Sequence, residues 1–339
     1  MHILVTGGTG YIGSHTVVEL LDKDHQVTIL DNLSTSHKEV LERIQKITGK
    51  SPAFEEMDLC DREKVLAFFR THRFDAVIHF AAFKAVGESV EFPLRYYRNN
   101  LISLINLVEA MQGSPLPRLV FSSSCSIYGE PDTVPVSETT RLGKAASPYG
   151  NTKQIGEEIL QDVCCSPGFN VIALRYFNPA GAHDSAFIGE FPIQPPSNLV
   201  PVISETASGK RKEFQVYGND YHTPDGTCIR DYIHVVDVAK AHVTAIERLA
   251  GNTQKTSFEI FNLGTGKGFS VMEVIRTFEK ATGIKLNYKL ADRRPGDVAQ
   301  IYADTALANQ ELRWKTEKTL EDILLSAWKW EQEMNKKNS

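Results

Sequence analysis

A glycine-rich turn between two regular segments constrains the fold of this chain more than any other feature. The apolar run Ile3–Thr6 predicts a buried strand, and the turn Gly7–Gly13 follows it at once. A helical pattern then runs over Ser14–Leu21. Glycines in such a turn permit a tight bend and a close approach of the backbone to a pyrophosphate, while the helix N-terminus supplies amide donors. Strand, turn and helix together predict a dinucleotide-binding unit.

The residue after the second apolar run supports this interpretation. Gln26–Leu30 has the composition of a strand and is followed by Asp31, at a suitable distance for an acidic residue that binds the adenosine ribose. A carboxylate at this place repels a 2′-phosphate, so we expect NAD rather than NADP. A glycine-rich loop that binds no ligand is the alternative, and the flanking strand, the helix and Asp31 argue against it.

Strand and helix patterns alternate through the first half of the chain. Further strands are expected at Ala53–Met57, Ala76–Ala81, Arg118–Ser122 and Val171–Tyr176, with helices near 36–48, 61–71, 90–112 and 149–165. This alternation predicts an α/β fold with a Rossmann-type doubly wound parallel sheet. Ligands of such folds bind outside the carboxyl ends of the strands, so the residues that follow the strands are candidates for a binding site.

The sequence changes in character near residue 179, because five prolines fall between residues 179 and 201. Shorter strands are expected beyond them at 213–217 and 258–262, with helices at 235–249, 270–281 and 319–334. We therefore expect two domains: residues 1–178 form a Rossmann domain that binds the dinucleotide, and residues 179–339 form a smaller C-terminal α/β substrate domain. The chain is expected to cross back to the first lobe near residues 230–250.

Composition argues against several classes of partner. The formal net charge of −5 over 339 residues gives no basic field for nucleic acid or for an anionic membrane. No run approaches ~18 uninterrupted apolar residues, and the first strand begins too early to leave room for a signal peptide. The five cysteines are an odd number and, like the ten histidines, show no metal-ligand spacing. We expect a cytoplasmic protein with reduced thiols and no metal.

Three residues could transfer a proton. Tyr149 and Lys153 are four residues apart in a predicted helix, so their side chains share one face, and Ser124 follows the strand expected at 118–122. A free tyrosine titrates near pH ~10, and a nearby cation favours its phenolate. The spacing alone also fits an ordinary amphipathic helix, and it gains weight only from the dinucleotide-binding unit upstream.

Several short runs, taken together, carry a resemblance to a known family. They are Thr6–His15, Asp31–Leu33, His79–Ser89, Ser122–Ser124, Ser147–Lys153, Arg175–Pro179, Arg230–His234 and Arg293–Asp297. Over essentially its whole length, the chain resembles the UDP-glucose 4-epimerase (UDP-galactose 4-epimerase) family of the extended short-chain dehydrogenase/reductase superfamily. Lys84–Ser89 is the most family-specific stretch, whereas the glycine turn identifies only the superfamily.

The resemblance implies a reversible, NAD-dependent epimerisation of UDP-galactose and UDP-glucose at C4, through a transient 4-keto intermediate, in galactose metabolism. Tyr149 would remove the proton from the sugar 4-hydroxyl, and Ser124 would hydrogen-bond the same oxygen. Lys153 would depress the pKa of Tyr149 and bond the nicotinamide ribose. NAD would be tightly bound and regenerated in each cycle. A homodimer is also implied, with the UDP-hexose held by the smaller domain.

The resemblance further implies two sets of contacts. Cofactor contacts are expected from Gly7, Gly10, Tyr11, Ile12, Gly13, Asp31, Asn32, Ser36, Asp58, Leu59, Phe80, Ala81, Ala82, Lys84, Asn99, Ser124, Tyr149, Lys153 and Phe177. Substrate contacts are expected from Lys84, Ser124, Tyr149, Asn178, Asn198, Leu199, Tyr217, Arg230, Arg294, Asp297 and Ile301. Arginine suits a diphosphate because its planar fork donates two parallel hydrogen bonds. The alternatives are an inert helix-face amide for Asn99 and surface solvation for Arg230 and Arg294.

Two features bear on the substrate contacts. The loop Phe191–Ser197 differs from the family's usual Asp-Pro-x-Gly-Ile-Pro-Asn, which weakens the contacts expected before Asn198. At the position of Ile301, the family is thought to limit the room for an N-acetyl group: tyrosine excludes the group and a small residue admits it. Isoleucine is intermediate in bulk, so acceptance of UDP-N-acetylhexosamines stays open.

Two other activities share parts of this pattern. A sugar-nucleotide 4,6-dehydratase has the same scaffold and the Tyr-x-x-x-Lys pair, but it needs an acid and a base beside the position of Ser124. This chain has Ser123 and Cys125 there, which do not suit that role. A non-catalytic dinucleotide sensor would keep the fold and lose the chemistry; the intact Ser124, Tyr149 and Lys153 argue against it, although fold alone does not decide.

Overall fold

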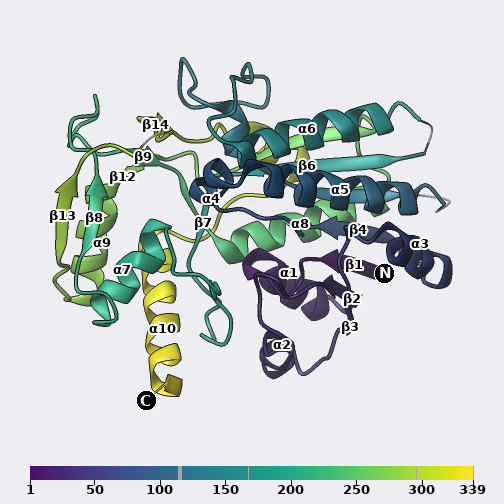
Figure 1. The fold of residues 1–339 in the computed structure, drawn as a ribbon, viewed down its shortest axis with the longest axis horizontal. Coiled ribbons are helices and arrows are strands. Elements are labelled where there is room, and N and C mark those ends of the chain that lie inside the picture. Colours follow the sequence, from purple (N-terminus) through teal and green to yellow (C-terminus); the bar gives the residue numbers. More distant parts are fainter. Residues whose placement is uncertain (114–116, 167, 295, 339) are drawn as a thin grey trace.

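A seven-stranded parallel sheet forms the larger lobe (Figure 1). The computed structural model describes residues 1–113, 117–166, 168–294 and 296–338, so Pro295 of the Arg293–Asp297 run lies outside the described residues. The strand order is β11-β6-β5-β4-β1-β2-β3, and all neighbours are parallel. The strands are β1 (His2–Thr6), β2 (Gln26–Asp31), β3 (Ala53–Glu56), β4 (Ala76–His79), β5 (Arg118–Ser124), β6 (Asn170–Tyr176) and β11 (Phe258–Leu263). The predicted Rossmann-type fold is confirmed.

Helices cover both faces of this sheet. On one face lie α1 (Tyr11–Asp22), α2 (Val40–Thr48) and α8 (Val235–Ala250); on the other lie α3 (Arg62–Thr71), α5 (Pro93–Met111) and α6 (Pro148–Val163). Alternate strand residues enter the two cores, so Ile3 and Val5 pack on the α1 side and Leu4 on the α5 side. The strands are therefore apolar on both faces, as burial in a parallel sheet requires.

Among the described residues, the smaller lobe contains short strands and three helices. β8 (Phe214–Tyr217) pairs with β13 (Tyr288–Ala291), and β9 (Ile229–Arg230) lies between β12 (Phe269–Ser270) and β14 (Gln300–Ile301). Helices α7 (Leu199–Ala207), α9 (Val271–Thr282) and α10 (Leu320–Asn338) contribute to one shared core. β7 (Asn178–Ala180) and β10 (Tyr232–His234) form a parallel pair where the chain leaves and re-enters the larger lobe.

Two predicted elements differ from the structure. The prediction that residues 258–262 belong to the smaller lobe is wrong, because β11 pairs with β6 and closes the edge of the large sheet. Without that pairing, β6 would leave an apolar edge strand exposed. The helix predicted over 90–112 is divided into α4 (Val86–Glu91) and α5, because Pro93 disfavours helical geometry at Phe92, whose φ is −124° and ψ 61°.

The remaining short helices are η1 (Cys125–Tyr128), a 3-10 turn after β5, and η2 (Ala308–Leu312), a π-helical turn that packs on the larger lobe. Within the described ranges, none of the helices is both long and apolar enough to span a bilayer. Those same ranges contain no group of three or more His, Cys, Asp or Glu side chains suited to a metal ion.

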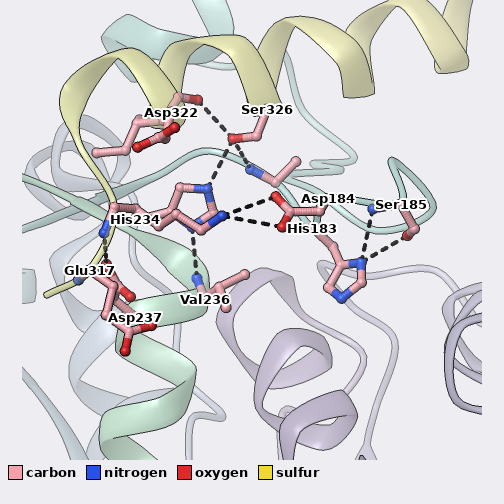
Figure 2. Close-up of polar contacts among 12 residues, drawn as sticks. His183, Asp184, Ser185, His234, Val236, Asp237, Glu317, Asp322 and Ser326 are labelled. Carbon is pink, nitrogen blue, oxygen red and sulfur yellow. Dashed lines mark hydrogen bonds and ion pairs between the residues drawn. The ribbon is translucent and has the colours of Figure 1, made fainter. Parts of the chain in front are cut away.

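A buried histidine joins α10 to the start of α8 (Figure 2). His234 Nδ1 accepts a hydrogen bond from the Val236 amide at 3.1 Å and so caps α8. The other ring nitrogen, Nε2, lies 3.0 Å from Ser326 Oγ, which also accepts from the Ala182 amide. Because Nδ1 must accept, the ring proton is on Nε2 and the imidazole is neutral.

Candidate active site

The glycine turn brings the end of β1 against the end of β4. Gly7 has a φ of +70°, and a Cβ there would lie 2.7 Å from the Ala81 nitrogen. A Cβ at Gly13 would lie 2.2 Å from the Gly7 carbonyl oxygen. Helix α1 begins after Gly10 with no side-chain cap, so its first amides are available to an anion. Strand order reverses between β1 and β4, which places this turn at the topological switch point.

We expect Gly13→Ala to lower the free energy of unfolding by about 1–3 kcal/mol, because the added methyl group meets a rigid carbonyl rather than a movable side chain. Urea unfolding measures this loss of stability. The amount of dinucleotide bound to the purified protein should decrease as well. Gly87→Ala is the matched control, since a Cβ there meets no atom within 4 Å. Equal effects of the two substitutions would contradict the close packing of the turn.

Asp31, at the end of β2, is held by three donors. One carboxylate oxygen accepts from the Thr9 amide at 3.2 Å, and the other accepts from the Leu33 amide at 2.9 Å and from Ser36 Oγ at 3.2 Å. Ser36 also lies 2.7 Å from Thr9 Oγ1. The glycine turn and the carboxylate are thus one hydrogen-bonded unit, which holds Asp31 in place at the end of β2.

Four other expected cofactor contacts lie beyond β2 and β3 or on α5, and each has a partner within the chain. Asn32 Oδ1 accepts from the Ser34 amide, and Asp58 Oδ1 accepts from the Cys60 amide. The Leu59 carbonyl accepts a hydrogen bond from the Asn106 side chain, and the side-chain amide of Asn99 donates to Asn100 Oδ1. Cys60 Sγ lies 3.7 Å from the Asn99 carbonyl oxygen, so Asn99 adjoins the end of β3.

Ser124 and Tyr149 lie together where β5 ends and α6 begins. Ser147 caps α6 by accepting from the Gly150 amide at 3.2 Å, and Pro148 occupies its first position, so Tyr149 falls in the first turn. Burial raises the pKa of Tyr149 to about 12, and the neighbouring Ser124 hydroxyl acts in the opposite direction. In this environment Tyr149 is a neutral phenol at neutral pH.

Lys153 is buried next to this pair, with 4% of its surface exposed. Its Nζ donates to the Ser122 carbonyl at 2.6 Å and lies 5.9 Å from the centre of the Tyr149 ring. Burial lowers the pKa of Lys153 to about 7, against the opposing charge of Glu157. The expected depression of the Tyr149 pKa by Lys153 is absent here, because burial acts on both groups and disfavours the charge on each.

A buried ion pair supports the helix that carries Tyr149 and Lys153. Glu157 accepts from Ser123 Oγ and from two nitrogens of Arg175, at 3.0 and 2.6 Å. Arg175 also donates to the Tyr128 hydroxyl at 3.0 Å. Sequence reasoning missed Glu157, although its position four residues after Lys153 was a signal that could have found it.

Two arginines expected to bind the substrate meet at one carboxylate. Arg294 Nε lies 3.0 Å from Asp297, and Arg230 Nη2 lies 3.8 Å from it. The Arg294 guanidinium also lies over the ring of Tyr217, 4.7 Å from its centre. These four residues, Arg230, Arg294, Asp297 and Tyr217, are called the arginine cluster below. It brings together the ends of β8 and β9 with the segment before β14, which sequence spacing alone could not show.

The arginine cluster adjoins the catalytic candidates through Cys125. This thiol follows Ser124 directly, and its pKa is raised to about 12 by burial, while the nearby charge of Arg230 opposes that rise. Ile301 is paired in register with Arg230 and is buried in a small apolar cluster with Phe177. The expected cofactor and substrate contacts therefore converge from both lobes.

The other expected contacts lie at the junction of the lobes. Asn178 begins β7, and within the described residues its buried Oδ1 has no hydrogen-bond donor. Asn198 is the N-cap of α7, directly before Leu199, and its side chain donates to Glu190 at 3.2 Å. Lys84 donates to the same glutamate at 2.8 Å. No sequence signal marked Glu190.

Two expected cofactor contacts lie close to Lys84. The Tyr11 hydroxyl donates to the Gly181 carbonyl at 2.6 Å, and Lys84 Nζ lies 5.6 Å from the centre of the Tyr11 ring. Ile12 follows in the first turn of α1, and Phe80, Ala81 and Ala82 follow β4 beside Gly7. The first turn of α1 therefore lies between the sheet edge and the segment that leads into the smaller lobe.

Comparison with known proteins gives consistent results. A model of the NAD dependent epimerase/dehydratase family matches residues 3–264. The UDP-glucose 4-epimerase of Bacillus subtilis (strain 168) is 50% identical over 332 residues, which cover 98% of this chain and 97% of the relative. That of Drosophila melanogaster is 48% identical over 336 residues, covering 97% and 96%.

Solved structures agree in fold. A UDP-glucose-4-epimerase from Stenotrophomonas maltophila, with bound NAD and formylated UDP-arabinopyranose, superposes with a TM-score of 0.95 at 46% identity and covers 99% of each chain. A UDP-glucose 4-epimerase from Bifidobacterium longum, in complex with NAD⁺ and UDP, has a TM-score of 0.94 at 45% identity and covers 98% of each chain.

Proposed function

The chain belongs to the NAD dependent epimerase/dehydratase family, and from this premise we propose that it interconverts UDP-galactose and UDP-glucose by epimerisation at C4, within galactose metabolism. The observation that carries the proposal is the position of Ser124 and Tyr149 at the carboxyl edge of the Rossmann sheet, next to the arginine cluster. The relatives that share half of the sequence support the same substrate pair.

The larger lobe fits NAD. The uncapped start of α1 suits a pyrophosphate, Gly7 and Gly13 let the backbone approach closely, and Asp31 is held in place for a ribose. The carboxylate of Asp31 also disfavours a 2′-phosphate. Bound NAD supplies the hydride acceptor, and later the donor, at the sugar carbon.

The residues of the chain itself handle the proton and the diphosphate. As its phenolate, Tyr149 takes the proton of the sugar 4-hydroxyl, Ser124 hydrogen-bonds the same oxygen, and loss of hydride from C4 leaves a transient 4-keto sugar. Lys153 holds the ribose side of the site and adds positive charge when protonated. Because the neutral phenol is favoured in this environment, a cation beside Tyr149 is needed to favour its phenolate.

Inversion requires a firm grip on UDP and a loose grip on the hexose. Arg230 and Arg294 can donate bidentately to the diphosphate, and Asn178 offers a buried acceptor without a partner among the described residues. The hexose can then turn about its link to the diphosphate and present its other face to the hydride. We propose that the smaller lobe, without α8 and β11, is the UDP-sugar-binding domain.

The two alternative functions are not favoured. A 4,6-dehydratase needs an acid and a base beside Ser124, but Ser123 donates to Glu157 and burial keeps Cys125 a neutral thiol with a pKa of about 12. A non-catalytic sensor has no need of a tyrosine, a serine and a lysine placed together at the sheet edge.

One assay tests the proposal. Purified protein is incubated with UDP-galactose, and the formation of UDP-glucose is followed without added NAD. We expect interconversion from cofactor that remains bound through purification. No interconversion, even when NAD is supplied, would refute the proposal. The same assay with UDP-N-acetylglucosamine reports whether the buried Ile301 leaves room for an N-acetyl group.

We infer a homodimer from an exposed apolar face on α5. Leu94 is 79% exposed and Ile105 47%, and Ile102 lies on the same helical face. An apolar face of this kind supports a protein interface.

The five free cysteines further support a reducing compartment such as the cytoplasm.

We expect Ile105→Glu to shift the protein from dimer to monomer, because the carboxylate would lose its water in the interface. Size-exclusion chromatography with light scattering measures the mass. Leu290→Glu is the matched control, since Leu290 is 55% exposed on β13, far from α5 in the fold. A dimer that survives the change at residue 105 would place the interface elsewhere.

A further inference from the structure

One oxygen of Glu190 holds two of the expected ligand contacts. Its Oε1 accepts from Lys84 Nζ at 2.8 Å and from Asn198 Nδ2 at 3.2 Å. Lys84 follows β4 in the larger lobe, and Asn198 is the N-cap of α7 in the smaller lobe. The carboxylate therefore bridges the lobes, and only 11% of the Glu190 side chain is exposed.

The residues on both sides of Glu190 are tightly packed. Trp330 Nε1 donates to the Glu190 carbonyl at 3.1 Å, and a Cβ at Gly189 would lie 2.6 Å from the Trp330 ring. On the other side, the Phe191 ring stacks on His37 with centroids 4.1 Å apart. A carboxylate carried by so constrained a backbone is held in place and does not depend on a flexible loop.

Glu190 puts its negative charge where an anionic ligand is expected. Burial, and then the charge of Glu190, raise the pKa of the neighbouring Tyr11 phenol well above its usual range. Lys84 and Asn198 are cationic and amide donors, the groups that recognise phosphate oxygens. A diphosphate that approaches them meets a like charge and competes for the same hydrogen bonds.

We propose that Glu190 is an internal counter-ion that occupies Lys84 and Asn198 and so weakens the affinity of the protein for a nucleoside diphosphate. The inference rests on the proposed function for the identity of the ligand. A residue with a purely structural role would weaken binding when it is changed. An internal counter-ion gives the opposite result, because removing its charge weakens its hold on the two donors and removes a repulsion.

Binding of UDP and of uridine to the NAD-loaded protein, measured by titration calorimetry, tests this role. Glu190→Gln keeps the size of the side chain and removes its charge. We expect UDP to bind about two- to fivefold more tightly, the range that a partly exposed ion pair supports. Uridine, which has no phosphate, should bind as before, and the gain for UDP should shrink in about 0.5 M salt.

Glu331→Gln is the matched control, because Glu331 is also 11% exposed and also accepts from a lysine, Lys210 at 2.8 Å. It should leave UDP affinity unchanged. UDP binding that is unchanged or weaker in Glu190→Gln overturns the proposal, provided that the native protein binds UDP. If the native protein does not bind UDP, the proposed function fails first and this inference fails with it.

A second variant covers the case in which Glu190→Gln does not fold. Glu190→Asp keeps the charge and draws it back by one methylene group, so one carboxylate oxygen can no longer reach both donors. We expect a smaller tightening of UDP binding than Glu190→Gln would give, again with uridine unaffected. No tightening in this variant also overturns the proposal.

Discussion

Tyr149→Phe is expected to lower the turnover of UDP-galactose by about 10²- to 10⁴-fold, the range that a positioned acid–base group contributes. The substitution removes only the hydroxyl that takes the proton of the sugar 4-hydroxyl. The glycine turn and Asp31 are untouched, so the content of bound NAD should be unchanged. Steady-state assays and the absorbance of the released cofactor measure the two quantities separately.

Tyr288→Phe is the control for this substitution. Tyr288 lies on β13 of the smaller lobe and is not among the expected contacts, so turnover should stay near that of the native protein. Native-like turnover in Tyr149→Phe would show that another group takes the proton. Loss of NAD together with turnover would show that the hydroxyl serves the fold of the cofactor site instead.

Lowering the pH from 7 to 5.5 is expected to reduce the free energy of unfolding by up to about 5 kcal/mol. Burial lowers the pKa of His15 and His79 to about 3 and of His234 and His242 to about 4. The unfolded chain binds these protons below a pKa of about 6.5, whereas the folded chain does not. The stability is therefore complete well above that pH and falls on acidification from pH 7 to 5.5, by about 1 kcal/mol or slightly more per histidine.

The same histidines offer a direct check by urea unfolding at the two pH values. His234→Asn can still accept from the Val236 amide (Figure 2), but it does not titrate, so the loss on acidification should shrink by about 1 kcal/mol. His222 is exposed, and His222→Asn should leave the loss unchanged. Buried carboxyls with a raised pKa, such as Asp231 and Asp237, offset part of the effect at lower pH. A pH-independent midpoint would contradict the neutral, buried state of the histidines.

Local pattern was enough to predict most elements of the larger lobe. Strands such as β1 and β2 are short apolar runs bounded by turns, and the amphipathic stretches between them are helices, so the alternation indicates a parallel sheet. Local pattern could not predict which lobe β11 belongs to. Its residues have strand composition in either lobe, and only the unpaired edge of β6 selects the partner.

The candidate site likewise has residues that the sequence predicts and contacts that only the fold creates. Ser124, Tyr149 and Lys153 follow from spacing and from their positions at strand and helix ends. By contrast, Arg230 meets Asp297 across 67 positions of the chain (297 − 230), and Lys84 meets Glu190 across 106 positions. No local pattern encodes such pairs, because they depend on how distant segments of the chain pack together.

The sequence by itself determined the glycine turn, the carboxylate after the second strand, and a phenol one helical turn from an ammonium. Each is a property of neighbouring residues and of the period of a strand or helix. Only the tertiary structure decided the protonation of that phenol and ammonium, because burial raises the pKa of Tyr149 and lowers that of Lys153. It also decided that a glutamate stands among the expected ligand contacts. Burial and long-range pairing arise when distant segments pack together, so spacing along the chain could not reveal them.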